Sequence, residues 1–122
     1  MIIKPMPESV SNLKAFRSGG GIADYTYLVY FDIAPKDFNE VLKSRPFELS
    51  KRQLNNISMF RSSLGTNTFT PVFTRYVGDD WPSPHEWGEV EIYEYHTENH
   101  HWSHYIITDK EHKRVYYDAG CI

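Results

Sequence analysis

Residues 24–33 read DYTYLVYFDI, and this stretch decides what kind of fold the chain forms. It is rich in aromatic and β-branched residues, the types that are enriched in strands. Alternate side chains along it share one face, which is the two-residue period of an extended chain. The stretch therefore predicts a strand, and one face of that strand carries Tyr25, Tyr27, Val29, Phe31 and Ile33.

Helical patterns lie on both sides of this strand. Apolar residues three apart predict a short helix over residues 8–16. After the strand, Pro35 suits a first helical position and acidic residues follow it, so we expect a helix over 35–44. A capping pattern that begins at Ser50 predicts a further helix over 51–64.

The rest of the chain changes to strand patterns separated by polar or Pro- and Gly-rich stretches. Residues 78–88 are expected to form an irregular surface loop, because they hold two prolines between two glycines. The predicted strands cover residues 68–77, 89–96, 102–109 and 114–118. We therefore predict a single α+β domain over residues 1–122, with an antiparallel sheet of about four to five strands and two helices packed on one face.

The formal charges are distributed unevenly along the chain. The net charge is −3, yet no Lys or Arg occurs between Tyr76 and Asp109. The same window holds all three tryptophans and five of the six histidines. Its acidic residues are Asp79, Asp80, Glu86, Glu89, Glu91, Glu94, Glu98 and Asp109.

An acidic and aromatic surface of this kind is typical of proteins that bind a basic partner. Trp and Tyr are common interface anchors, and carboxylates around them attract cationic surfaces. The leading hypothesis is a non-enzymatic protein-binding module, such as an immunity-type inhibitor that caps a basic toxin or nuclease. The expected contact residues are Asp79, Asp80, Trp81, Glu86, Trp87, Glu89, Glu91, Glu94 and Tyr95.

A second interpretation of the same residues requires no partner. Trp and Tyr are common in protein cores, and glutamates on exposed strand positions protect a sheet from aggregation. In residues 89–96, Val90 and Ile92 would face one side of the sheet, while Glu89, Glu91, Tyr93 and Tyr95 would share a solvated face on the other side.

The histidines suggest an alternative function as a small metal-binding or hydrolytic enzyme. His96, His100 and His104 recur every four residues, a spacing that can align imidazoles. Residues 97–99 read as a turn, however, which separates these side chains. We therefore expect no metal site, no cofactor and no catalytic residue, and the sequence contains no nucleophile elbow, zincin motif, P-loop or dinucleotide fingerprint.

Other features exclude further classes of function and bear on the cellular compartment. Clustered Lys and Arg, on which nucleic-acid affinity depends, are missing from this acidic chain. No run of apolar residues approaches the length of a membrane span. Cys121 is the single cysteine, so no disulfide forms within the chain, and we expect a cytoplasmic protein. The oligomeric state stays open.

Overall fold

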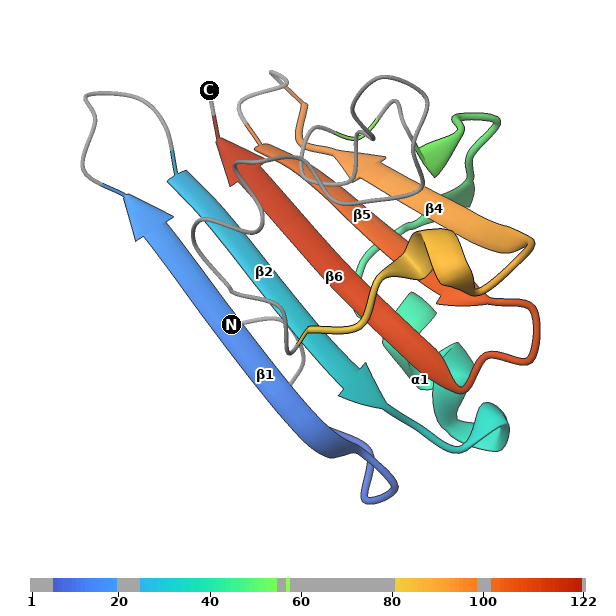
Figure 1. Ribbon diagram of the computed structural model, residues 1–122. Coiled ribbons are helices and arrows are strands. Elements are labelled where there is room, and N and C mark those ends of the chain that lie inside the picture. Colours follow the sequence, from blue (N-terminus) through green and yellow to red (C-terminus); the bar gives the residue numbers. More distant parts are fainter. Residues whose placement is uncertain (1–5, 20–24, 55–56, 58–80, 99–101, 122) are drawn as a thin grey trace.

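The computed structural model describes residues 6–19, 25–54, 57, 81–98 and 102–121 (Figure 1). These residues form a six-stranded sheet in which every neighbouring pair of strands is antiparallel. In spatial order the strands are β1 (Ser11–Gly19), β2 (Tyr25–Asp32), β6 (Arg114–Cys121), β5 (Trp102–Asp109), β4 (Val90–His96) and β3 (Glu48–Leu49). The last strand in the sequence thus lies in the middle of the sheet.

One face of the sheet packs against a short helical segment, and we call it the helix face. After β2 the chain forms a 3-10 turn, η1 (Pro35–Asp37), and then the helix α1 (Phe38–Leu42). Phe38 and Val41 are the buried residues of α1. The buried core on this face consists of Phe31, Ile33, Phe38, Val41, Ile106, Val115, Tyr117 and Ala119.

The opposite face carries a second buried core. The 3-10 turn η4 (Pro84–Glu86) and its flanking residues lie over it. Trp87 stacks on Tyr116 with ring centroids 5.8 Å apart, and the Tyr116 hydroxyl donates a hydrogen bond to the carbonyl of Pro82. The buried residues are Leu28, Tyr30, Ile57, Ile92, Ile107 and Tyr116. The central strands are therefore buried on both sides.

Several predicted elements are confirmed. The predicted strand 24–33 is β2, residues 89–96 and 102–109 are β4 and β5, and the predicted helix 35–44 corresponds to η1 and α1. Residues 110–113 connect β5 to β6 as a hairpin, in which Asp109 accepts hydrogen bonds from the amides of Lys113 and Arg114. β6 is longer than the predicted strand 114–118 because pairing with both neighbours continues to Cys121.

The predicted helix over residues 8–16 is wrong, because residues 11–16 belong to the edge strand β1. β1 pairs with β2 from Lys14 to Gly19, and the register shifts between Ser11 and Lys14. Asn12 lies at this bulge with a φ of 52°, a conformation that Asn adopts more readily than most residues. This edge strand is largely exposed, so it lacks the dense run of aromatic and β-branched residues that marks β2.

The fold-class prediction is correct for an α+β protein with an antiparallel sheet, but its element counts are wrong. The described residues contain six strands rather than four or five, and one α-helix rather than two. Residues 51–53 are not helical. The Ser50 hydroxyl does accept the amide of Arg52, as a cap would, but it also donates to Glu94, and the Ser50 amide bonds to Ile92. Contacts with β4 therefore replace the first turn of the predicted helix.

Some predicted segments lie outside the described residues. They are residues 55–56 and 58–64 of the helix predicted over residues 51–64, the whole predicted strand 68–77, and residues 78–80 of the predicted loop. Within the described part of the chain, the longest helix has five residues, and none could cross a membrane.

Two carboxyl groups are buried in the sheet, and their pKa values are shifted in opposite directions. Asp118, in the middle of β6, is buried on the face opposite α1, and burial raises its pKa to about 7. Asp109 is also buried, and burial raises its pKa. The amides of Lys113 and Arg114 and the Arg114 guanidinium outweigh this effect, so the pKa of Asp109 is lowered overall. Asp118 is thus stabilised as the neutral acid and Asp109 as the anion.

Replacing Asp118 by Asn should stabilise the protein at high pH. The unfolded Asp118 loses its proton near pH 4, while the folded one keeps it to about pH 7, so the stability of the native protein falls as pH rises through this window. Asp118→Asn removes that cost, and the gain should reach a few kcal/mol at pH 8 and vanish near pH 4. Urea unfolding at both pH values measures it.

Asp109→Asn is a matched control, for which the expected change in stability at pH 8 has the opposite sign. Asp109→Asn weakens three hydrogen bonds to a buried carboxylate, so it should destabilise the protein at pH 8 by about 1–3 kcal/mol. If Asp118→Asn also destabilises the protein at pH 8, the Asp118 carboxyl is not held in its neutral form.

Candidate ligand-binding pocket

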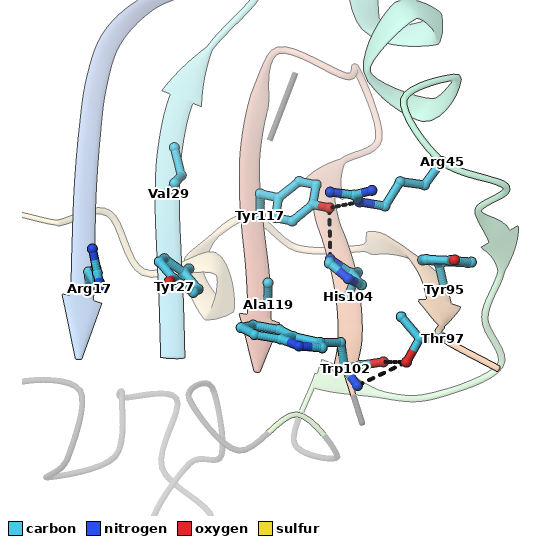
Figure 2. A pocket seen from close by; sticks show the side chains of 10 residues that line it. All are labelled: Arg17, Tyr27, Val29, Arg45, Tyr95, Thr97, Trp102, His104, Tyr117 and Ala119. Atoms are coloured by element: carbon cyan, nitrogen blue, oxygen red, sulfur yellow. Dashed lines mark hydrogen bonds between the residues drawn. The ribbon is translucent and has the colours of Figure 1, made fainter. Parts of the chain in front are cut away.

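The end of the helix face that α1 leaves uncovered forms a pocket with a volume of about 670 Å³ (Figure 2). A volume of this size is in the range of small-molecule sites. Side chains from β1, β2, β6, β5 and β4 and from the segments after α1 and after β4 line it. The lining residues are Arg17, Tyr27, Val29, Arg45, Tyr95, Thr97, Trp102, His104, Tyr117 and Ala119.

Strand register brings the central lining residues into one row across the sheet. Tyr27 on β2 pairs with Ala119 on β6, Ala119 pairs with His104 on β5, and His104 pairs with Tyr95 on β4. These four residues come from separate parts of the sequence. Ala119 is the small member, so it leaves space between the rings on either side.

The indole of Trp102 occupies the space beside Ala119. Its ring centroid is 5.8 Å from that of Tyr27 and 6.2 Å from that of His104, with interplanar angles of 30° and 26°. Figure 2 shows the indole next to the Ala119 methyl group. Tyr27, Trp102 and His104 therefore form a stack of three rings along one side of the pocket.

Two arginines give the pocket its charge. The Arg45 Nε donates a hydrogen bond of 3.1 Å to the Tyr117 hydroxyl, which fixes the guanidinium at the pocket wall. The Arg17 guanidinium lies 5.6 Å from the centre of the Tyr27 ring, a cation–π distance. None of the ten lining residues is acidic. A cleft lined by charges of one sign attracts ions of the other, so this pocket favours anions.

His104 adds a neutral polar group. Its Nδ1 forms a hydrogen bond of 2.9 Å with the Tyr117 hydroxyl, so this one hydroxyl contacts both His104 and Arg45. Burial lowers the pKa of His104 to about 4, and the positive charge of Arg45 and the neighbouring His96 contribute to the shift. The imidazole is therefore neutral at physiological pH, and the arginines set the charge of the pocket.

The structure places the sequence-predicted contact residues in several different environments. Tyr95 lines the pocket, whereas Trp81 and Trp87 pack on Tyr116 on the opposite face. Glu86 is exposed on η4. Asp79 and Asp80 lie outside the described residues.

The three predicted glutamates around β4 interact with cationic or imidazole groups of the same chain. Glu89 lies 2.6 Å from the Lys110 Nζ, and Glu91 lies 2.6 Å from the His112 Nε2. Glu94 lies 3.0 Å from the Arg52 Nε. The sequence window without Lys or Arg thus gains cationic neighbours from the β5–β6 hairpin and from the segment after β3.

The predicted contact residues do not share one face. On β4, Ile92 and Glu94 face away from α1, while Glu91, Tyr93 and Tyr95 are on the helix face. The alternation expected for Val90 and Ile92 is confirmed, but the other face is not a solvated surface. Tyr93 packs against Phe38 of α1, with ring centroids 6.0 Å apart.

The histidine spacing does not produce a shared site among the described residues. His96 contacts Tyr105 and Glu94 on the face opposite α1, whereas His104 contacts Tyr117 on the helix face. The sheet therefore separates these two imidazoles. His100 lies outside the described residues, and no group of three metal-ligating residues occurs within the described ranges.

The sequence analysis missed most of the pocket. Arg17 follows the segment that was wrongly predicted as a helix, Arg45 follows the predicted helix over residues 35–44, and Ala119 carries no recognisable pattern. A signal for Tyr27 was present, since it is on the predicted face of residues 24–33. Which other side chains join it depends on the register of four strands.

Comparisons of the chain with protein-family models, with curated proteins and with solved structures found no match.

Removing the Arg45 charge should raise the pKa of His104. In Arg45→Gln the pKa should move up from about 4 but stay below 6.5, because burial is the larger cause of the shift and persists. NMR titration of the assigned imidazole signals measures it. Lys36→Gln, which removes an exposed charge from η1, should leave the His104 titration unchanged. An identical His104 titration in Arg45→Gln would show that Arg45 does not act on it.

Proposed function

We propose that this protein is a non-enzymatic binding protein that takes a small organic anion with an apolar body into the pocket on the helix face. The observation that carries the proposal is the lining, in which two arginines and four aromatic side chains surround about 670 Å³ and the described lining residues include no carboxylate. The rings and Val29 suit an apolar body, and the guanidinium groups suit a negative charge. Because the chain as a whole is acidic, a cationic pocket is not a by-product of net charge.

The chemistry of the lining favours binding over catalysis. General acid–base catalysis works best with a group whose pKa is close to the working pH. His104, with a pKa of about 4, is a weak base at neutral pH, and burial raises the pKa of Tyr117 above its usual value. Among the residues that the structure describes, the lining also lacks a carboxylate to orient or activate either group. These features support a pocket that holds a ligand unchanged.

Binding of a basic protein partner by the acidic window stays a prediction, and the geometry supports it less well. Glu89, Glu91 and Glu94 already interact with groups of the same chain, and Trp81 and Trp87 are partly buried against a core. A partner would have to compete with these contacts. Glu86 and Glu98 are exposed and are available to such a partner.

The proposal is tested with an aromatic anion and a variant that fills the pocket. Titration calorimetry with 1-anilinonaphthalene-8-sulfonate should give one site per chain. Val29 lines the pocket on the central strand β2, so Val29→Phe adds volume there without removing a polar group. This variant should bind the dye at least ten-fold more weakly.

A matched control separates pocket filling from damage to the fold. Val90→Phe makes the same change at a partly buried position on the opposite face, and it should leave dye affinity within two-fold of the original protein. Melting temperatures of both variants check that each is folded. Equal dye affinity in folded Val29→Phe and in the unchanged protein would refute the proposed pocket function.

A further inference from the structure

We propose that the ligand of this pocket is an aromatic monocarboxylate, with its carboxylate on the Arg45 guanidinium and its ring against the aromatic lining. This inference rests on the proposed function and names the class of ligand. Three observations support it: the orientation of the Arg45 guanidinium, the amount of negative charge that the pocket can balance, and the aromatic character of the lining.

Arg45 is held ready to bind a planar anion. It is partly buried, and its Nε is occupied by the Tyr117 hydroxyl, which in turn is fixed by His104. No acidic group among the described residues forms an ion pair with Arg45. The terminal N–H groups of a guanidinium form a planar fork that matches the two oxygens of a carboxylate. The Tyr117 contact thus orients the fork and leaves its outer part for a ligand.

The charge balance favours one negative charge over two. A buried charge is tolerated only when it is paired and hydrogen-bonded. Arg45 is the partly buried cation of the lining, while Arg17 is exposed and lies on the Tyr27 ring. His104 is neutral and contributes no further positive charge. One carboxylate therefore balances the inner part of the pocket, whereas a phosphate dianion would leave excess negative charge there.

The other lining residues favour an aromatic body. Tyr27, Trp102 and His104 form the ring stack, and Tyr95 lies on the far side of His104 with ring centroids 5.5 Å apart. Aromatic rings pack on one another in offset or edge-to-face arrangements that a flat ligand can join. Ala119 and Val29 are the aliphatic residues of the described lining, so little of that lining is shaped for a branched aliphatic chain.

Calorimetry with three probes that share one ring system tests this inference. The probes are 2-naphthoate, the neutral 2-naphthalenemethanol and the dianionic 2-naphthyl phosphate. We expect 2-naphthoate to bind at least ten-fold more tightly than either of the other two. Val29→Phe should weaken 2-naphthoate binding as it weakens dye binding.

Variants of Arg45 test where the carboxylate lies. Arg45→Gln should weaken 2-naphthoate binding at least ten-fold and change binding of the alcohol by less than two-fold. Arg45→Lys keeps the positive charge but lacks the planar fork of N–H groups, so it should restore only part of the 2-naphthoate affinity that Arg45→Gln loses. Arg52→Gln removes an arginine on the opposite face and should have no effect on either probe.

The outcomes distinguish this inference from the proposed function. If 2-naphthyl phosphate binds more tightly than 2-naphthoate, or if no naphthyl probe binds while Val29→Phe still blocks the dye, the carboxylate assignment is wrong and the pocket function stands. Equal loss of the acid and the alcohol in Arg45→Gln would also overturn the assignment. If Val29→Phe affects no ligand, both proposals fail.

Discussion

The pairing of β6 with β2 on one side and β5 on the other is the constraint on which the rest of the structure depends. β6 contacts both neighbours along its whole length, and its alternate side chains enter the two cores. Tyr116 forms the centre of one core and Tyr117 the centre of the other, so two consecutive residues organise opposite faces. Burial on both faces explains why β6 lacks the alternation of polar and apolar residues that marks a half-exposed strand. It also explains why this strand was predicted too short.

The pocket results from a difference in length between the helix and the strands. An α-helix of five residues is about 7.5 Å long. A strand of eight residues, such as β2 or β6, extends over about 26 Å. α1 therefore covers only one end of the helix face, where Phe38 and Val41 complete the core. At the other end the side chains of Tyr27, Trp102 and His104 pack on one another instead. Phe47, which contacts both Tyr95 and Tyr117, forms the boundary between the covered and the open end.

Local sequence patterns predicted correctly those elements in which the propensity of the residues agrees with their environment in the folded sheet. Residues 24–33 are rich in aromatic and β-branched residues because β2 is a central strand, and Pro35 begins a helical turn because its φ suits that position. The prediction was wrong for β1 because Asn12 forms a bulge and the edge strand is exposed. The acidic window was interpreted from sequence distance alone, whereas Lys110 and His112 lie across a hairpin from Glu89 and Glu91. The pocket was beyond prediction for the same reason: Tyr27, Ala119, His104 and Tyr95 meet only through the register of four strands.

On each face of the sheet, burial keeps one titratable group neutral, in contrast to Asp109, whose charge is balanced by two backbone amides and Arg114. Asp118 on β6 and His104 on β5 are both titratable and both buried, and burial shifts each pKa toward the neutral form, upward for the acid and downward for the base. Next to the neutral His104 imidazole, the charge of Arg45 is poorly screened by water, so its attraction for an anion is stronger than that of an exposed arginine. The Tyr117 hydroxyl holds that charge in place without neutralising it, as a carboxylate partner would. The proposed anion selectivity of this end of the helix face therefore depends on two features, the neutral His104 imidazole and a fixed guanidinium without a carboxylate partner among the described residues.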